Sequence, residues 1–227
     1  FWNDLSVPYI PVGPIDLGAI FINGRMGVDL FFVLSGFLIA SHLLQSFEKQ
    51  RAFAPVLRSY IPRRFFRIAP VYYFVLFVAL LGFFPFYPYP ESYDNIGFRV
   101  LYHLAFMQDY LPSDIVVVFW SLGIEIKFYL LAPFLIFGLL ALKNHRLALI
   151  ILSLMMISQP LILAVFVPNP AVFYYYFMNV RTSFHLSLDG LLMGVFAAFL
   201  WHSDTMRQTL SQRKVAGSLF FGGLTVF

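Results

Sequence analysis

Long continuous apolar runs, rather than alternating ones, dominate this 227-residue chain. A helix needs about 20 apolar residues to cross the ~30 Å hydrocarbon core of a bilayer. Five runs approach or exceed that length: residues 28–44, 69–87, 115–142, 147–167 and 172–201. A sixth begins near Val215 and continues to Phe227. Because backbone polar groups inside a membrane must be satisfied internally, such runs form helices. We therefore predict an all-α, polytopic transmembrane helix bundle with five full spans and one truncated span.

The composition supports a membrane protein. Hydrophobic residues make up 60% of the chain and charged residues 11%, whereas a soluble domain is about half apolar and a quarter charged. The absence of cysteine excludes disulfides and thiolate metal sites, and we expect no metal site and no nucleic-acid partner. The chain opens with Phe1 and stops within an apolar run. We interpret residues 1–227 as a single transmembrane domain that is incomplete at both ends.

The basic residues predict the orientation of the bundle in the membrane. Eleven of them fall in loops on one side: Lys49, Arg51, Arg58, Arg63, Arg64, Arg67, Lys143, Arg146, Arg207, Arg213 and Lys214. The opposite loops hold Arg25 and Arg99. The positive-inside rule places the basic loops in the cytoplasm. On the outer side, residues 96–107 form a short amphipathic stretch, which at 12 residues is expected to lie at the interface rather than to span.

An acidic residue opens the first apolar run, Gly27-Val28-Asp29-Leu30-Phe31-Phe32-Val33-Leu34-Ser35-Gly36-Phe37-Leu38-Ile39. A carboxylate in such a run is costly unless it faces a partner or a water-filled cavity. Asp29 is therefore a candidate to orient a base or to bind a substrate hydroxyl. The alternative is an interfacial acid that ends a helix in headgroup water.

A second acid lies deeper, in Trp120-Ser121-Leu122-Gly123-Ile124-Glu125-Ile126-Lys127-Phe128-Tyr129-Leu130-Leu131-Ala132-Pro133. Counted from Ile115, Glu125 is about 15 Å along its helix, near the middle of the membrane. An ionisable residue at that depth is a functional-site hypothesis by default. A Glu125–Lys127 ion pair is the structural alternative, but residues two apart do not face each other on a helix.

An arginine cluster occurs in Tyr60-Ile61-Pro62-Arg63-Arg64-Phe65-Phe66-Arg67-Ile68-Ala69-Pro70. Pro62 fits the start of a helix, whose first turn offers free N–H groups to an anion. Arg63 and Arg64 lie four and three residues before Arg67, so the three side chains can converge on a phosphate. Binding of lipid headgroups explains the same residues equally well.

The last predicted span contains a polar stripe. Arg181, His185 and Asp189 recur every four residues, so on one helix they would share a face toward the bundle interior. The stripe could relay protons, line a substrate site or form an internal salt bridge. Gly190 and Gly194 form a small-xxx-small pair that permits close helix packing.

These four motifs, in this order, resemble the acyltransferase 3 family of membrane O-acyltransferases, which includes O-antigen acetylases. The matching segments are residues 27–39, 63–70, 120–133 and 181–194. The resemblance implies a multi-pass protein of the bacterial inner membrane. Such an enzyme moves an acyl group, commonly acetyl from acetyl-CoA, to a hydroxyl of a cell-surface carbohydrate. Its partners would be the lipid bilayer, the carbohydrate and the acyl-CoA co-substrate, with no bound cofactor.

The resemblance also implies roles for individual residues. It gives Asp29 and Glu125 catalytic roles, and it gives Arg63, Arg64 and Arg67 to the phosphates of the donor. We expect the substrate to be lined by the remaining polar and aromatic candidates, Trp120, Ser121, Arg181, His185 and Asp189. Family members place a catalytic histidine in the helix before the Gly-Val-Asp segment. No histidine precedes His42 here, so we expect that group upstream and this segment alone to be inactive.

Two other functions fit the same residues. A transporter or flippase of a sugar or lipid-linked substrate could use Asp29, Glu125 and the Arg181–Asp189 stripe as a translocation path, because intramembrane ionisable residues serve both classes of protein. A third hypothesis is that the protein is a structural subunit in which these residues form internal salt bridges. The oligomeric state cannot be predicted from these motifs.

Overall fold

A computed structural model describes residues 11–12, 15–16, 26–83, 95–111, 113–166 and 182–203. Two short strands, β1 (Pro11–Val12) and β2 (Ile15–Asp16), pair antiparallel. The rest of the described secondary structure is helical. Its elements are α2 (Met26–Gln50), α3 (Phe53–Leu80), α4 (Ile96–Leu104), α5 (Phe119–Ala141), α6 (His145–Phe166), the 3₁₀ helix η3 (Phe184–Leu186) and α8 (Asp189–Trp201).

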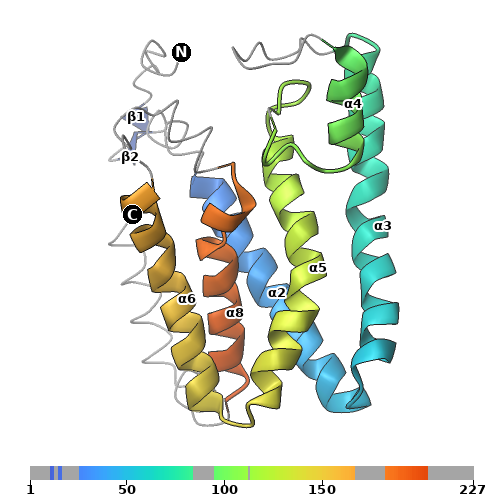
Figure 1. The fold of residues 1–227 in the computed structure, drawn as a ribbon. Helices are drawn as coiled ribbons and strands as arrows, with labels where there is room; N and C mark the ends of the chain where they lie inside the picture. Colours follow the sequence, from blue (N-terminus) through green and yellow to red (C-terminus); the bar gives the residue numbers. More distant parts are fainter. Residues whose placement is uncertain are drawn as a thin grey trace.

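The long helices form an up-and-down bundle, as the sequence predicts (Figure 1). Helices α2, α5 and α8 run in one direction, and α3 and α6 run in the other. The connections 51–52 and 142–144 lie at one end together with Lys49, Arg51 and Lys143, and we call this the inner end. Helix α4 lies at the opposite, outer end (Figure 1). The basic residues at these two connections thus share one end of the bundle, as the positive-inside rule requires. Four arginines that were expected in a loop lie inside α3 instead: Arg58, Arg63, Arg64 and Arg67. Arg207, Arg213 and Lys214 lie outside the described residues.

Within the described residues, three helices are long and apolar enough to cross a membrane: Gly27–Gln50, Phe119–Ala141 and His145–Ile162. Helix α3 has the length, at 28 residues, but carries arginines in its interior. Helix α8 is apolar but has 13 residues. The protein is therefore an integral membrane helix bundle. Exposed Ile150, Leu154, Ile157 and Leu161 form a stripe on α6 that suits contact with lipid.

Several predicted boundaries are corrected by the structure. The prediction that Pro62 starts a helix is wrong, because α3 begins at Phe53 and includes Pro62 in its interior. Helix α5 begins at Phe119 rather than near Ile115. The described part of the predicted 172–201 span is not one continuous helix, since η3 and an extended residue, Ser183, precede α8.

Two glycines allow α2 and α8 to pack backbone against backbone. A Cβ atom on Gly36 would lie 2.1 Å from the Leu191 carbonyl oxygen, and a Cβ on Gly194 would lie 2.1 Å from the Val33 carbonyl oxygen. The close packing predicted for Gly194 is therefore confirmed, and Gly190 also lies against α2, beside Phe32. This contact holds the helix that carries Ser35 against the rest of the bundle.

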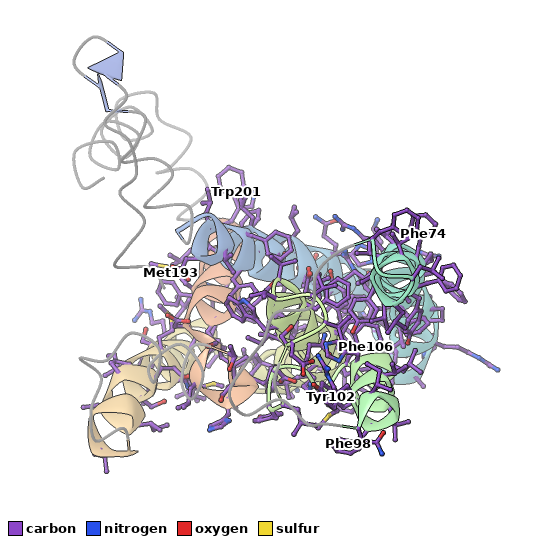
Figure 2. All side chains as sticks on the ribbon, turned by 90° about the horizontal axis from the view of Figure 1, so that it is seen from above. Phe74, Phe98, Tyr102, Phe106, Met193 and Trp201 are labelled. Atoms are coloured by element: carbon purple, nitrogen blue, oxygen red, sulfur yellow. The ribbon has the colours of Figure 1, made fainter. Side chains whose placement is uncertain are left out.

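Aromatic packing anchors residues 105–111 and 113–118, which we call the outer-end loop, on α3. The Tyr72 ring lies 4.3 Å, centre to centre, from both Phe106 and Phe119. Viewed from the outer end, Phe106 points toward the interior, whereas Phe74 and Trp201 lie at the edge of the bundle (Figure 2). The Asn95 side chain caps α4 by accepting a 3.2 Å bond from the Phe98 N–H. The predicted amphipathic stretch is thus a short helix packed on the bundle.

Candidate functional site

Glu125 is the centre of a buried polar group between α2, α3 and α5. Glu125 is 3% exposed. It lies six residues after Phe119, the first residue of α5, or about 9 Å along the helix axis. The depth of 15 Å expected from the sequence is too large, because α5 starts later than predicted. Oε1 of Glu125 accepts hydrogen bonds from the Tyr129 hydroxyl at 2.5 Å and from Ser35 Oγ at 3.1 Å. These bonds offset the cost of burying a carboxylate in an apolar bundle.

Local helix geometry explains why these groups meet. Glu125 and Tyr129 are four residues apart and share a face of α5. Ser35 comes from the middle of α2, which packs against α5. Ser35 also precedes Gly36, so the close approach of α2 to α8 fixes the height of its hydroxyl relative to Glu125. Residues 90 positions apart in the sequence are joined in this way.

The arginine cluster lies on α3 beside the carboxylate rather than in a loop. Arg64 is partly buried, and its guanidinium carbon lies 5.6 Å from the ring centre of Tyr60 and 5.8 Å from that of Tyr129. Both distances suit cation–π contacts. Arg64 and Arg67 also attract the Glu125 carboxylate. Arg63 and Arg67 are exposed. The anion site proposed for the first turn of a helix is excluded, because this segment is 10 or more residues inside α3.

The structure places Asp29 apart from this group. Asp29 is exposed in the first turn of α2, six residues or about 9 Å along the axis from Ser35. Asp189 is also exposed, in the first turn of α8. A carboxylate in the first turn of a helix is stabilised by the free N–H groups there. Their positions fit the interfacial alternative for Asp29 and leave its catalytic role a prediction.

The described residues of the expected substrate lining come from three elements: Trp120 and Ser121 from α5, His185 from η3 and Asp189 from α8. Trp120 is buried and packs edge-on against Phe32, with ring centres 6.1 Å apart. The Ser121 hydroxyl donates to the Val118 carbonyl at 3.0 Å. His185 is exposed in η3 and stacks on Tyr110. His185 and Asp189 are not on one helix, because His185 lies in η3 and Asp189 begins α8. Arg181, the third residue of the predicted stripe, lies outside the described residues.

A second polar cluster, which sequence reasoning missed, lies in the outer-end loop before α5. Buried Asp114 forms a 2.8 Å ion pair with Arg99 and accepts a 2.8 Å hydrogen bond from Tyr102. Buried Asp109 pairs with Lys127, whose ammonium also donates to the Phe106 carbonyl at 2.6 Å. One sequence signal could have located this cluster. Lys127 lies inside an apolar helix and needs an acidic partner, and that partner cannot be Glu125, which is only two residues away.

His103 is the buried imidazole of this second cluster. It is fully buried, and its Nδ1 lies 2.8 Å from the Arg99 carbonyl oxygen, which is consistent with Nδ1 carrying the proton. The Tyr72 hydroxyl donates to the His103 carbonyl at 2.7 Å, tying α3 to α4. Burial lowers the pKa of the His103 imidazole below its ordinary value of 6.5. The bond to the Arg99 carbonyl and the Asp114 carboxylate favour the charged form, and the Arg99 guanidinium opposes it, but burial has the largest effect.

This lowered pKa predicts acid sensitivity of the outer end. Below about pH 6.5 the unfolded chain binds a proton that folded His103 resists, so stability is lost as the pH falls from 7.5 to 5.5. Thermal unfolding midpoints in detergent, measured over that range, should fall less steeply in His103→Gln. His145→Gln, at the exposed inner end, is the matched control. Equal slopes in wild type and His103→Gln would contradict this account.

Comparisons with known proteins identify the family. The family described as "Acyltransferase domain", acyltransferase 3, matches residues 2–227. The peptidoglycan O-acetyltransferase OatA of Listeria monocytogenes is 29% identical over 210 residues, which cover 86% of this chain and 32% of that protein. The O-acetyltransferase OatA of Staphylococcus aureus is 28% identical over 222 residues, covering 90% and 34% respectively.

The chain therefore spans about a third of the length of these curated relatives. No solved structure matches the chain significantly. The family match covers all four motifs and also the outer-end loop between them. On this match the chain belongs to the acyltransferase 3 family.

Proposed function

We propose that this protein is a membrane O-acetyltransferase of the bacterial inner membrane, which moves acetyl from an acyl-CoA donor to a hydroxyl of a cell-surface carbohydrate. The observation that carries the proposal is Glu125, a buried carboxylate beside Arg64 and Arg67 inside an acyltransferase-family bundle. The names of the bacterial relatives, O-acetyltransferases and in one case a peptidoglycan O-acetyltransferase, support the acetyl group and the carbohydrate acceptor.

The proposed reaction is an acyl transfer. The acceptor hydroxyl oxygen attacks the thioester carbonyl, an ester C–O bond forms, the C–S bond breaks, and the hydroxyl proton passes through a base to leave with the thiol. The family resemblance assigns the base to a histidine in the helix that precedes the Gly-Val-Asp segment. Glu125 would orient that imidazole or the acceptor hydroxyl, since general base catalysis requires both within hydrogen-bond reach.

The arginines would hold the donor. Guanidinium groups bind phosphate bidentately, and CoA carries several phosphates. Arg63 and Arg67 are exposed, whereas Arg64 is partly buried against two tyrosine rings, so Arg63 and Arg67 are the better candidates for direct phosphate contact. Arg64 would contribute charge from its place between two tyrosine rings. Such contacts position the donor without touching the reacting carbonyl.

The function is tested with the whole protein in membranes that receive radiolabelled acetyl-CoA. Label should enter cell-envelope carbohydrate as a base-labile ester, at a rate well above that of membranes lacking the protein. Label confined to membrane protein or lipid would contradict the carbohydrate acceptor. An absence of transfer from acetyl-CoA, with the protein folded in the membrane, would contradict the proposed donor.

Arg67→Ala is expected to raise the KM for acetyl-CoA by about 10-fold or more. Loss of a charge-assisted hydrogen bond costs about 1.5–3 kcal/mol, and each 1.4 kcal/mol is tenfold in affinity. Initial rates against donor concentration measure the change. Arg58→Ala is the matched control, because Arg58 is an exposed arginine nine residues earlier on the same helix. An unchanged KM in Arg67→Ala, or an equal rise in Arg58→Ala, would sink the assignment.

A further inference from the structure

One side chain in the site touches both the carboxylate and the arginine cluster. The Tyr129 hydroxyl donates the shorter of the two hydrogen bonds to Oε1 of Glu125, at 2.5 Å against 3.1 Å for Ser35. The ring of the same tyrosine lies 5.8 Å from the Arg64 guanidinium carbon. Tyr129 therefore uses its two chemically different parts on two different elements of the site.

The surroundings hold Tyr129 in this position. The residue is 5% exposed and belongs to the core that joins α2, α5 and α8. Arg64 also approaches the ring of buried Tyr60, at 5.6 Å, so two tyrosines from α3 and α5 flank its approach to the carboxylate. A buried tyrosine has two side-chain torsions, and its contacts here constrain both, so it loses little further freedom when substrate binds.

We propose that Tyr129 is the positioning residue of this site: its hydroxyl fixes the Glu125 carboxylate and its ring fixes the Arg64 guanidinium. The inference rests on the proposed acetyl transfer at Glu125 and adds to it. A single side chain then sets the distance between the carboxylate that orients the reacting atoms and the arginine whose charge attracts the donor. Because reaction rates depend steeply on that geometry, a misplacement of about 1 Å can cost about 10²-fold.

Two substitutions separate the two contacts. Tyr129→Phe keeps the ring over Arg64 and removes the hydrogen bond, so we expect kcat to fall about 10-fold or more with the donor KM unchanged. Tyr129→Leu also removes the ring, so we expect the donor KM to rise in addition, by about 5-fold. Ser35→Ala removes the longer bond to the same oxygen and should lower kcat by a smaller factor.

Tyr72→Phe is the matched control. Tyr72 is a buried tyrosine whose hydroxyl makes a 2.7 Å hydrogen bond to the His103 carbonyl, at the outer end and outside the site. Its loss tests the cost to stability of removing one buried hydroxyl. Rates are measured in membranes with radiolabelled acetyl-CoA, and thermal midpoints in detergent confirm that each variant folds. A split between kcat and KM is not expected from a purely structural role.

The outcomes distinguish this inference from the proposed function. A low kcat in Tyr129→Phe, with Tyr72→Phe near wild type, supports the positioning role. If Glu125→Gln abolishes transfer while Tyr129→Phe and Ser35→Ala keep wild-type kcat, the positioning role is overturned and the function stands. A rise in the donor KM of Tyr129→Phe with kcat retained also overturns it. If Glu125→Gln itself keeps full transfer, the proposed site fails.

Discussion

Glu125→Gln is expected to lower acetyl transfer by about 10²-fold or more while the protein still folds. Glutamine has nearly the same shape, and its side-chain oxygen can still accept the bonds from Tyr129 and Ser35. What is lost is the negative charge beside Arg64 and Arg67. Changing the carboxylate that orients a catalytic imidazole into its amide can lower kcat by about 10⁴-fold, so the loss should be seen in kcat.

The comparison requires a glutamate that is outside the site. Glu48 lies exposed near the inner end of α2, and Glu48→Gln makes the same chemical change there. Transfer of label to carbohydrate is measured for both variants, and their thermal midpoints in detergent are compared with wild type. If Glu125→Gln transfers acetyl within twofold of Glu48→Gln, Glu125 is a structural residue and the catalytic assignment is wrong.

The site was partly predictable because the membrane makes buried charge conspicuous. Glu125 stands out in an apolar helix, and the rejection of a Glu125–Lys127 pair follows from helix geometry. The structure agrees, since Lys127 pairs with Asp109 and Glu125 bonds Tyr129 and Ser35. Ser35 could not be assigned from sequence, because its contact with Glu125 depends on how α2 packs against α5.

The predicted helix start at Pro62 is wrong because proline inside a membrane helix does not mark a boundary as it does in soluble proteins. Pro62 was expected to begin a helix, yet α3 includes both Pro62 and Pro70. Membrane helices tolerate interior proline because neighbouring groups satisfy the freed carbonyls. The same continuity carries the arginines into the bundle and beside Glu125. A four-residue polar period likewise suggested one helix for the His185–Asp189 stripe, but periodicity does not reveal a break such as η3.

The outer-end loop could not be predicted because its contacts are tertiary. Asp109 and Asp114 lie in a stretch with no periodicity, and their partners come from α5 and α4 respectively. Gly123 allows the loop to approach α5: a Cβ there would lie 3.3 Å from the Phe106 carbonyl oxygen. Sequence alone gives no distance between these segments, so the cluster becomes visible only once the chain is folded.

The second large effect is a loss of stability when the backbone contact between α2 and α8 is forced apart. Gly194→Ala would place a methyl group 2.1 Å from the Val33 carbonyl oxygen and 2.5 Å from the Phe37 nitrogen. Both atoms belong to the α2 backbone, so no side-chain rotation relieves the clash. Overpacking typically costs about 1–3 kcal/mol, and separating two helices held by close backbone contact should reach at least the upper value.

Gly138→Ala is the control for this substitution. Gly138 lies in the interior of α5 with no atom within 4 Å of an added Cβ, so alanine there should be neutral or stabilising by up to about 1 kcal/mol. We expect the thermal midpoint of Gly194→Ala in detergent to fall well below that of Gly138→Ala. Transfer should fall as well, because moving α2 outward takes Ser35 away from Glu125. A Gly194→Ala protein as stable and active as wild type would show that α2 and α8 do not touch through their backbones.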